Sequence, residues 1–181
     1  IRQFTVNLQM PGAKVAGARF YFLKGVGARL EMGLLGLAMN KAIAAGFVPM
    51  ITPTLVKSDV MAGAGFLDNH ADEVYRLEAD DLYLTGTSEV ALAGYHADEI
   101  LEAAELPKRY FAYSPCFRSE AGSYGKDVRG YIRQHHFNKV EMVRIATPDQ
   151  APGELEAMTD RAQEVLRRLS LAHRVVRLCG G

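Results

Sequence analysis

Two long runs of strand-forming residues, separated by a polar loop, constrain the fold of this chain more than any other feature. The runs 110–120 and 131–145 are rich in aromatic and β-branched side chains. The loop 121–130 between them is polar and carries Gly122, Gly125 and Gly130. Two such runs joined by a glycine-bearing loop predict an antiparallel pair of strands at the centre of the fold.

The rest of the chain mixes helical and strand patterns. Apolar residues recur at helical spacing in 28–45 and 154–171, and a shorter helix is expected from Ser88, as its cap, towards Tyr95. Strands are expected at 19–23, at 47–51 as a buried strand, at 74–77 and 82–84 as a hairpin, and at 174–178. Because hairpins replace regular βαβ alternation, the sequence predicts an α+β fold with an antiparallel β-sheet flanked by helices.

Composition excludes several classes of protein. The 181 residues suit one domain, and 21 basic side chains balance 21 acidic ones, so a broad phosphate-binding surface is not expected. The two cysteines, Cys116 and Cys179, lie far apart, which argues against a disulfide framework or a zinc ribbon. No leader and no apolar run of membrane length is visible, so a cytoplasmic protein without membrane contact is predicted.

The second long run carries an unusually polar face. Because side chains alternate along a strand, Arg133, His135, Phe137, Lys139 and Glu141 are expected to share one face. Guanidinium groups bind phosphate oxygens, an aromatic ring stacks on a purine, and a carboxylate accepts hydrogen bonds from an amine or a hydroxyl.

On the preceding run, Arg118 and Glu120 also share a face, so the pair of strands suits a nucleotide together with a small amine. A surface ladder of ion pairs around one core phenylalanine explains the same pattern equally well. Neither a Walker loop nor a GxGxxG motif competes for the phosphate role.

Several motifs resemble those of class II aminoacyl-tRNA synthetases. Phe117-Arg118-Ser119-Glu120, followed by Arg133-Gln134-His135-His136-Phe137, resembles motif 2 of that class. The segment of about 28–53, with its proline at Pro53, resembles motif 1. The stretch 115–141 is closely similar to bacterial-type seryl-tRNA synthetases, as are 17–23 and 87–89.

This resemblance implies a role for each matching residue on the ATP side. Arg118 and Arg133 would be the catalytic arginines, binding the α-phosphate and the γ-phosphate of ATP. Glu120 would contact the adenine amino group, and Phe137 would stack on the ring. The main magnesium ligands of the family are expected beyond the end of this chain, and no metal site is expected within it.

The resemblance also implies a serine site and a contact with tRNA. Thr87 and Glu89 would receive the α-amino group of serine, Arg118 would also contact serine, and Glu141 would accept the serine hydroxyl. The loop 122–130 would close over ATP and meet the acceptor end of tRNA(Ser). Its Lys126 and Arg129 would contact that end, although a solvated loop is an equally good interpretation.

The residue chemistry agrees with these implied roles. Serine carboxylate attacks the α-phosphorus and pyrophosphate leaves, so catalysis is mostly positioning and charge stabilisation. A buried group that hydrogen-bonds the hydroxyl would discriminate serine from alanine, and Glu141 is the candidate. His135 and His136 point to opposite faces of a strand, so structural roles are favoured over metal binding.

Two parts of the family are not found in the sequence: the N-terminal helical arm that grips tRNA, and motif 3 with its further arginine. Residues 1–181 are therefore expected to form a partial catalytic domain, incomplete at its C-terminal end, with little or no serine-dependent ATP–pyrophosphate exchange alone. The family also implies a homodimer through motif 1. Two alternatives stay open: an enzyme that activates a small amino acid for a non-tRNA acceptor, and a non-catalytic nucleotide-binding paralogue.

Overall fold

A long antiparallel pair of strands forms the centre of the computed structural model, which describes residues 14–69, 71–121 and 132–178. Strand β5 (Lys108–Phe117) pairs with β6 (His136–Ile145) from Lys108 opposite Ile145 to Phe117 opposite His136. The predicted pair is confirmed, but the ladder ends at Phe117 and His136, whereas the two strands were expected to extend to residue 120 and to start at residue 131. Arg118, Glu120 and Arg133 therefore lie beyond the ladder.

A third strand extends this sheet. Strand β1 (Val48–Met50) pairs with β5 in parallel, which gives the order β1-β5-β6. The α+β class is confirmed, and the parallel pair is an addition to the antiparallel prediction. The expected burial of the first strand is wrong, because only Phe47 is buried while Val48 is 53% exposed.

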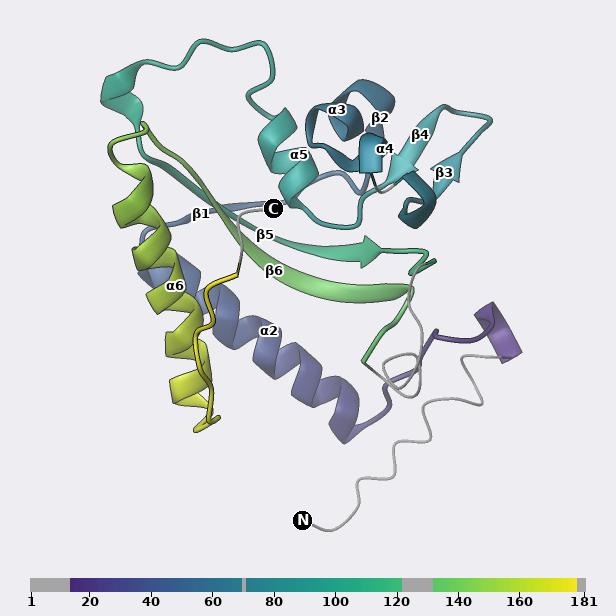
Figure 1. Ribbon diagram of the computed structural model, residues 1–181. Helices are drawn as coiled ribbons and strands as arrows, with labels where there is room; N and C mark the ends of the chain where they lie inside the picture. Colours follow the sequence, from purple (N-terminus) through teal and green to yellow (C-terminus); the bar gives the residue numbers. More distant parts are fainter. Residues whose placement is uncertain (1–13, 70, 122–131, 179–181) are drawn as a thin grey trace.

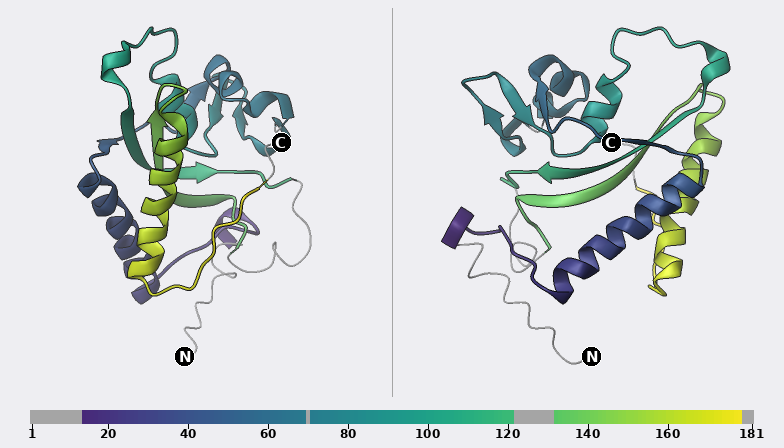
Figure 2. Two further views of the ribbon diagram at one scale, coloured as in Figure 1. Left: turned by 60° about the vertical axis from the view of Figure 1, so that its left-hand side comes forward. Right: turned by 180° about the vertical axis from the view of Figure 1, so that it is seen from behind.

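Two helices, α2 (Val26–Ala44) and α6 (Ala151–Arg168), cover one face of this sheet (Figures 1 and 2). Both were predicted, and α2 ends where Gly46 adopts a φ of 80°, which glycine adopts without strain. Phe111 and Phe47 pack with Ala42 in the core between sheet and helices. The apolar side chains around them are Met39, Ala45, Val140, Met142 and Met158.

A small second sheet lies on the opposite side of β5 and β6 (Figure 1). Its order is β2 (Leu55–Lys57), β4 (Leu82–Leu84), β3 (Arg76–Leu77), antiparallel throughout, which confirms the predicted hairpin. Short helical segments surround it: α3 (Ser58–Gly63), α4 (Phe66–Asn69), η1 (Ala71–Glu73), α5 (Glu89–Gly94) and η2 (Ala103–Glu105). Val56, Met61 and Val90 form the core of this layer.

Two predicted strands are not strands in the structure. Neither 19–23 nor 174–178 has a ladder partner within the described ranges, and a strand-forming sequence needs one to become a strand. Arg19 has a φ of 63°, and its carbonyl oxygen accepts a hydrogen bond from the His135 amide at 3.1 Å. Val175 and Val176 are exposed. In the described ranges, no helix has the length and apolar character that crossing a membrane requires.

Candidate functional site

The face of β5 and β6 turned away from α2 and α6 carries the predicted polar residues. Phe137, Lys139 and Glu141 of β6 lie opposite Cys116, Ser114 and Ala112 of β5, respectively. The three β5 side chains are small and buried. Small side chains beside large polar ones leave room on this face, and the segment between β4 and α5 covers part of it.

Four donors converge on the carboxylate of Glu141. The hydroxyls of Thr87 and Ser88 and the amide of Glu89 all donate to its Oε2, the last two at 3.1 Å each. Thr87 and Ser88 are almost completely buried. The predicted helix after residue 88 is present as α5, but the hydroxyl of Ser88 does not cap it. The Glu89 amide is bound by Glu141 and, at 3.3 Å, by Thr87 Oγ1.

The fourth donor, Lys139, has two partners. Its Nζ lies 2.8 Å from Glu141 Oε1 and 2.6 Å from Thr87 Oγ1. Burial raises the pKa of Glu141, but hydrogen bonds from Lys139 and Thr87 lower it by more, so the net shift is downward. Glu141 is therefore ionised at neutral pH, and an ionised carboxylate only accepts hydrogen bonds.

Arg118 joins this cluster to the aromatic ring of Phe137. Its Nε donates to the carbonyl oxygen of Gly86 at 3.1 Å, and its guanidinium carbon lies 5.3 Å from the centre of the Phe137 ring. A Cβ at Gly86 would lie 3.3 Å from the Phe117 carbonyl oxygen, so glycine permits this close approach. The arginine thus stands between the carboxylate cluster and the space beside Phe137.

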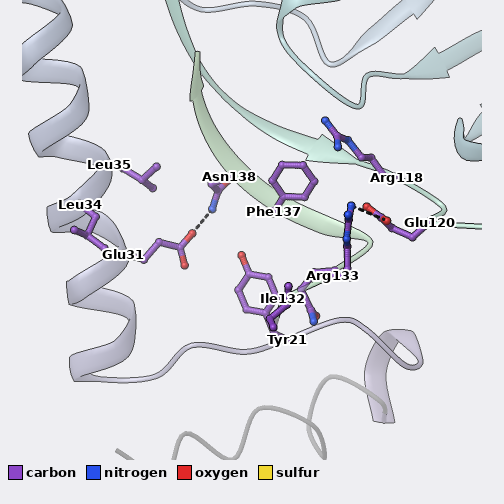
Figure 3. A pocket seen from close by; sticks show the side chains of 11 residues that line it. Tyr21, Glu31, Leu34, Leu35, Arg118, Glu120, Ile132, Arg133, Phe137 and Asn138 are labelled. Atoms are coloured by element: carbon purple, nitrogen blue, oxygen red, sulfur yellow. Dashed lines mark hydrogen bonds and ion pairs between the residues drawn. The ribbon is translucent and has the colours of Figure 1, made fainter. Parts of the chain in front are cut away.

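A groove of about 540 Å³ opens on the other side of Phe137 (Figure 3). Arg133 and Glu120 line one end, where their Nη1 and Oε2 atoms are 3.4 Å apart. Glu31 of α2 lines the other end and accepts a hydrogen bond from Asn138 at 2.7 Å. The remaining lining residues are Tyr21, Leu34, Leu35, Arg118, Ile132 and Gln134. Its volume lies within the usual range for small-molecule and cofactor sites.

The predicted site residues therefore form two adjoining groups. Thr87, Glu89 and Glu141 meet in the carboxylate cluster, whereas Arg118, Glu120, Arg133 and Phe137 line the groove. The side chain of Glu89 is exposed, but the hydroxyl of Thr87 is committed to Glu141 and Lys139. Lys126 and Arg129 lie outside the described residues.

Several residues of the site had no role predicted from the sequence. Lys139 was correctly predicted to share a face with Glu141. A lysine two residues from a glutamate on one strand face could have indicated their ion pair. Ser88 was interpreted only as a helix cap. No sequence pattern indicated that Tyr21, Glu31 and Asn138 would line the groove. They do so because α2 and residues 19–23 pack against β6.

The adjacent histidines have separate structural contacts. His135 Nδ1 lies 3.0 Å from the carbonyl oxygen of Arg118, and its ring packs against Phe20. The His136 ring stacks on Phe117, with 4.9 Å between the ring centres. Both sets of contacts agree with the structural roles predicted for this pair.

Comparisons with known proteins show the family to which this chain belongs. Residues 73–181 match the family model described as tRNA synthetase class II core domain (G, H, P, S and T). Over 170 residues, the chain is 61% identical to the serine–tRNA ligase of Thermobifida fusca and 58% identical to that of Clavibacter sepedonicus. These alignments cover 94% of the chain and 40% of each relative, so the chain spans about two fifths of their length.

Solved structures are similar as well. A seryl-tRNA synthetase from Pyrococcus horikoshii complexed with ATP matches with a TM-score of 0.83 and 39% identity, covering 87% of this chain and 35% of that one. A cytoplasmic serine–tRNA ligase from Naegleria fowleri in complex with AMP matches with a TM-score of 0.80 and 31% identity, covering 85% of this chain and 37% of that one.

Proposed function

We propose that this chain, which belongs to the class II tRNA synthetase core domain family, forms the serine-binding and part of the ATP-binding site of a serine–tRNA ligase. The observation that carries the proposal is the ionised Glu141 cluster, joined through Arg118 to a nucleotide-sized groove. The names of the relatives, and the ATP and AMP in the two similar structures, support the same assignment.

The serine pocket is the carboxylate cluster. Glu141 accepts the hydroxyl of serine, and the exposed carboxylate of Glu89 accepts its ammonium group. The Thr87 side chain acts by holding Glu141, because its hydroxyl is already committed within the cluster. Alanine lacks the hydroxyl, so its binding would leave Glu141 desolvated without a replacement partner, and this penalises the wrong amino acid.

The groove beside Phe137 is the ATP site. Phe137 offers its ring to adenine, Glu120 accepts from the adenine amino group, and Arg133 binds the γ-phosphate end. Arg118, between the groove and the serine pocket, neutralises the α-phosphate and contacts serine. Its place at the junction supports this double role.

The first reaction is adenylate formation. A carboxylate oxygen of serine attacks the α-phosphorus, the bond to the bridging oxygen breaks, and pyrophosphate leaves with that electron pair. The attacking carboxylate is already deprotonated, so the step requires no general base. The site then contributes orientation and positive charge where negative charge spreads over the phosphates. In the second reaction a hydroxyl of the terminal ribose of tRNA(Ser) attacks the carbonyl carbon of seryl-adenylate. The bond from that carbon to the phosphate oxygen breaks, AMP leaves with its electron pair, and the hydroxyl proton is released. Lys126 and Arg129 would contact this end of the tRNA.

Magnesium is proposed to arrive with the triphosphate, where it screens phosphate charge. Among the residues that the structure describes, no group of three or more His, Cys, Asp or Glu side chains could hold an ion.

The partner proposed for α2 and β1 is a second copy of the chain. Large apolar side chains remain exposed along these two elements: Val26, Leu30, Met32, Leu34, Ile43 and Val48. A surface of this kind is typical of an obligate interface. A homodimer through this surface, working in the cytoplasm on soluble substrates, is consistent with the proposed activity.

Serine-dependent ATP–pyrophosphate exchange by the full-length gene product tests the proposal. We expect exchange with serine, a kcat/KM for alanine at least about 100-fold lower, and transfer of serine to tRNA(Ser). Absence of serine-dependent exchange would overturn the proposal. Exchange without charging of tRNA(Ser) would instead support an acceptor other than tRNA.

A further inference from the structure

We propose that Lys139 is a positioning residue that sets the selectivity of the serine pocket, by fixing how Thr87 and Glu141 are arranged. The inference rests on the proposed function, since it concerns the same pocket. Lys139 Nζ bridges Thr87 Oγ1 at 2.6 Å and Glu141 Oε1 at 2.8 Å, and among the described residues no other cation forms a hydrogen bond or an ion pair with either group.

The first step of the argument concerns the two oxygens of Glu141. Thr87, Ser88 and the Glu89 amide all donate to Oε2. A carboxylate oxygen has about two lone-pair sites, which the three donors at Oε2 already share, so Oε2 has no site left for a ligand. Within the described part of the chain, Oε1 accepts from Lys139 alone, which leaves it one site. Oε1 is therefore the oxygen available to a substrate hydroxyl.

The second step concerns the direction of the hydrogen bonds. An ammonium group can only donate, so Thr87 Oγ1 must act as the acceptor towards Lys139. The single hydroxyl proton of Thr87 is then available to Glu141 Oε2, as the geometry requires. Lys139, which can only donate, and the ionised Glu141, which can only accept, therefore fix the polarity of this chain of hydrogen bonds from its two ends. A neutral amide at position 139 both donates and accepts, so it would remove one of these two constraints.

The third step concerns charge. Glu141 is largely enclosed, and such burial by itself favours the protonated acid. The cation of Lys139 and its hydrogen bond to Oε1 favour the carboxylate instead. An ionised Oε1 requires a donor on the ligand, which serine supplies and alanine does not. Removing the cation weakens this requirement, so selectivity falls as well as affinity.

A second lysine–glutamate ion pair, between Lys41 and Glu164, provides a control for the pair of Lys139 and Glu141. Lys41 Nζ lies 2.7 Å from Glu164 Oε1, between α2 and α6, and both pairs are about three quarters buried. Lys41, however, bonds to Glu164 alone among the described residues, and neither residue lines the groove or belongs to the cluster. Lys41 therefore controls for the loss of a largely buried lysine–glutamate pair.

The test is Lys139→Met in the full-length gene product, with serine and alanine compared in ATP–pyrophosphate exchange. We expect kcat/KM for serine to fall about 10- to 100-fold, mainly through KM for serine, because a hydrogen bond to a charged group is lost. We expect kcat/KM for alanine to change less than about threefold, so the serine-to-alanine ratio shrinks. Lys139→Arg should recover part of the ratio, and Lys41→Met should leave it unchanged.

Several outcomes would overturn the inference. One is an equal loss for serine and alanine in a Lys139→Met protein that has the melting temperature of the wild type. Another is a kcat/KM that stays at the wild-type value for both serine and alanine, which leaves their ratio unchanged. If Lys139→Met does not fold, Lys139→Gln decides, since it keeps a donor without the charge: a wild-type ratio overturns the inference and a reduced ratio supports it. Wild-type protein without serine-dependent exchange would contradict the proposed function instead.

Discussion

The carboxylate cluster and the nucleotide groove adjoin each other, yet they are held in very different ways. In the cluster, Glu141 and Lys139 lie within the β5–β6 ladder, and four donors reach one carboxylate. In the groove, Arg133 and Glu120 lie beyond the ends of the strands, and their ion pair spans 3.4 Å. The Arg133 side chain is 47% exposed, whereas Thr87 and Ser88 are almost completely buried.

This difference matches what the two ligands proposed for these regions require. Discrimination between amino acids that differ by one hydroxyl needs a fixed, desolvated acceptor, because only an acceptor that cannot relax penalises the wrong substrate. A triphosphate presents much charge over a large area, so exposed arginines can bind it without a rigid starting geometry. The cluster is therefore pre-organised by four hydrogen-bond donors, whereas Arg133 of the groove has one ion pair of 3.4 Å and a half-exposed side chain.

The largest expected effect is that of Glu141→Gln, which tests whether the cluster is as fixed as its contacts indicate. Donors face both carboxylate oxygens, so the amide group of glutamine meets a donor whichever way it is turned. We expect kcat/KM for serine in pyrophosphate exchange to fall about 1000-fold. Glu164→Gln, at the remote pair with Lys41, should stay within about twofold of wild type. More than a tenth of wild-type activity in Glu141→Gln would contradict a fixed acceptor.

Phe137→Leu sharpens the same comparison from the side of the groove. Leucine keeps apolar bulk but removes the stacking face, so KM for ATP should rise about 10- to 100-fold. KM for serine should change less than about threefold, since the cluster does not depend on the ring. Steady-state exchange kinetics with each substrate varied in turn measure both values. If KM for serine rose as much as KM for ATP, the cluster and the groove would not be separable. Phe137→Tyr keeps the stacking face and serves as the control, with KM values like those of the wild type.

The smallest effect expected is the coupling between Arg133 and Glu120. A double-mutant cycle with Arg133→Met and Glu120→Gln, followed by urea unfolding of the full-length gene product, should give at most about 0.5 kcal/mol, because the two atoms are 3.4 Å apart and the Arg133 side chain is 47% exposed, although that of Glu120 is buried. The same cycle with Lys139→Met and Glu141→Gln should give about 1–3 kcal/mol. Equal couplings in the two cycles would remove the basis of the comparison.

Sequence reasoning was most successful where a pattern repeats over many residues. The central strand pair and the helices α2 and α6 were predicted because period two and helical spacing persist along each of them. The shared face of Phe137, Lys139 and Glu141 followed from the same alternation. The roles of the site residues came from the resemblance of several motifs, and they remain proposals.

The remaining features depend on tertiary contacts that leave no local pattern. The strands end at Phe117 and His136, and the carbonyl oxygen of Arg19, far away in the sequence, accepts the His135 amide. The parallel pairing of β1 with β5 joins segments separated by the whole small sheet. The segment 174–178 has strand-forming residues but no ladder among the described residues, so propensity alone misled the prediction.

The parallel pairing of β1 with β5 also has a consequence for the order in which the molecule assembles. Val48 pairs with Tyr110, and the chain between them forms the small sheet and supplies Thr87, Ser88 and Glu89. On the ribosome, β1 emerges well before its partner, while the small sheet can form from neighbouring segments alone. Long-range pairings of this kind form late, because the intervening loop must close first. When β5 docks beside β1 and β6 follows, the donors of the segment between β4 and α5 meet Glu141, so we expect sheet closure and pocket formation to be one folding event.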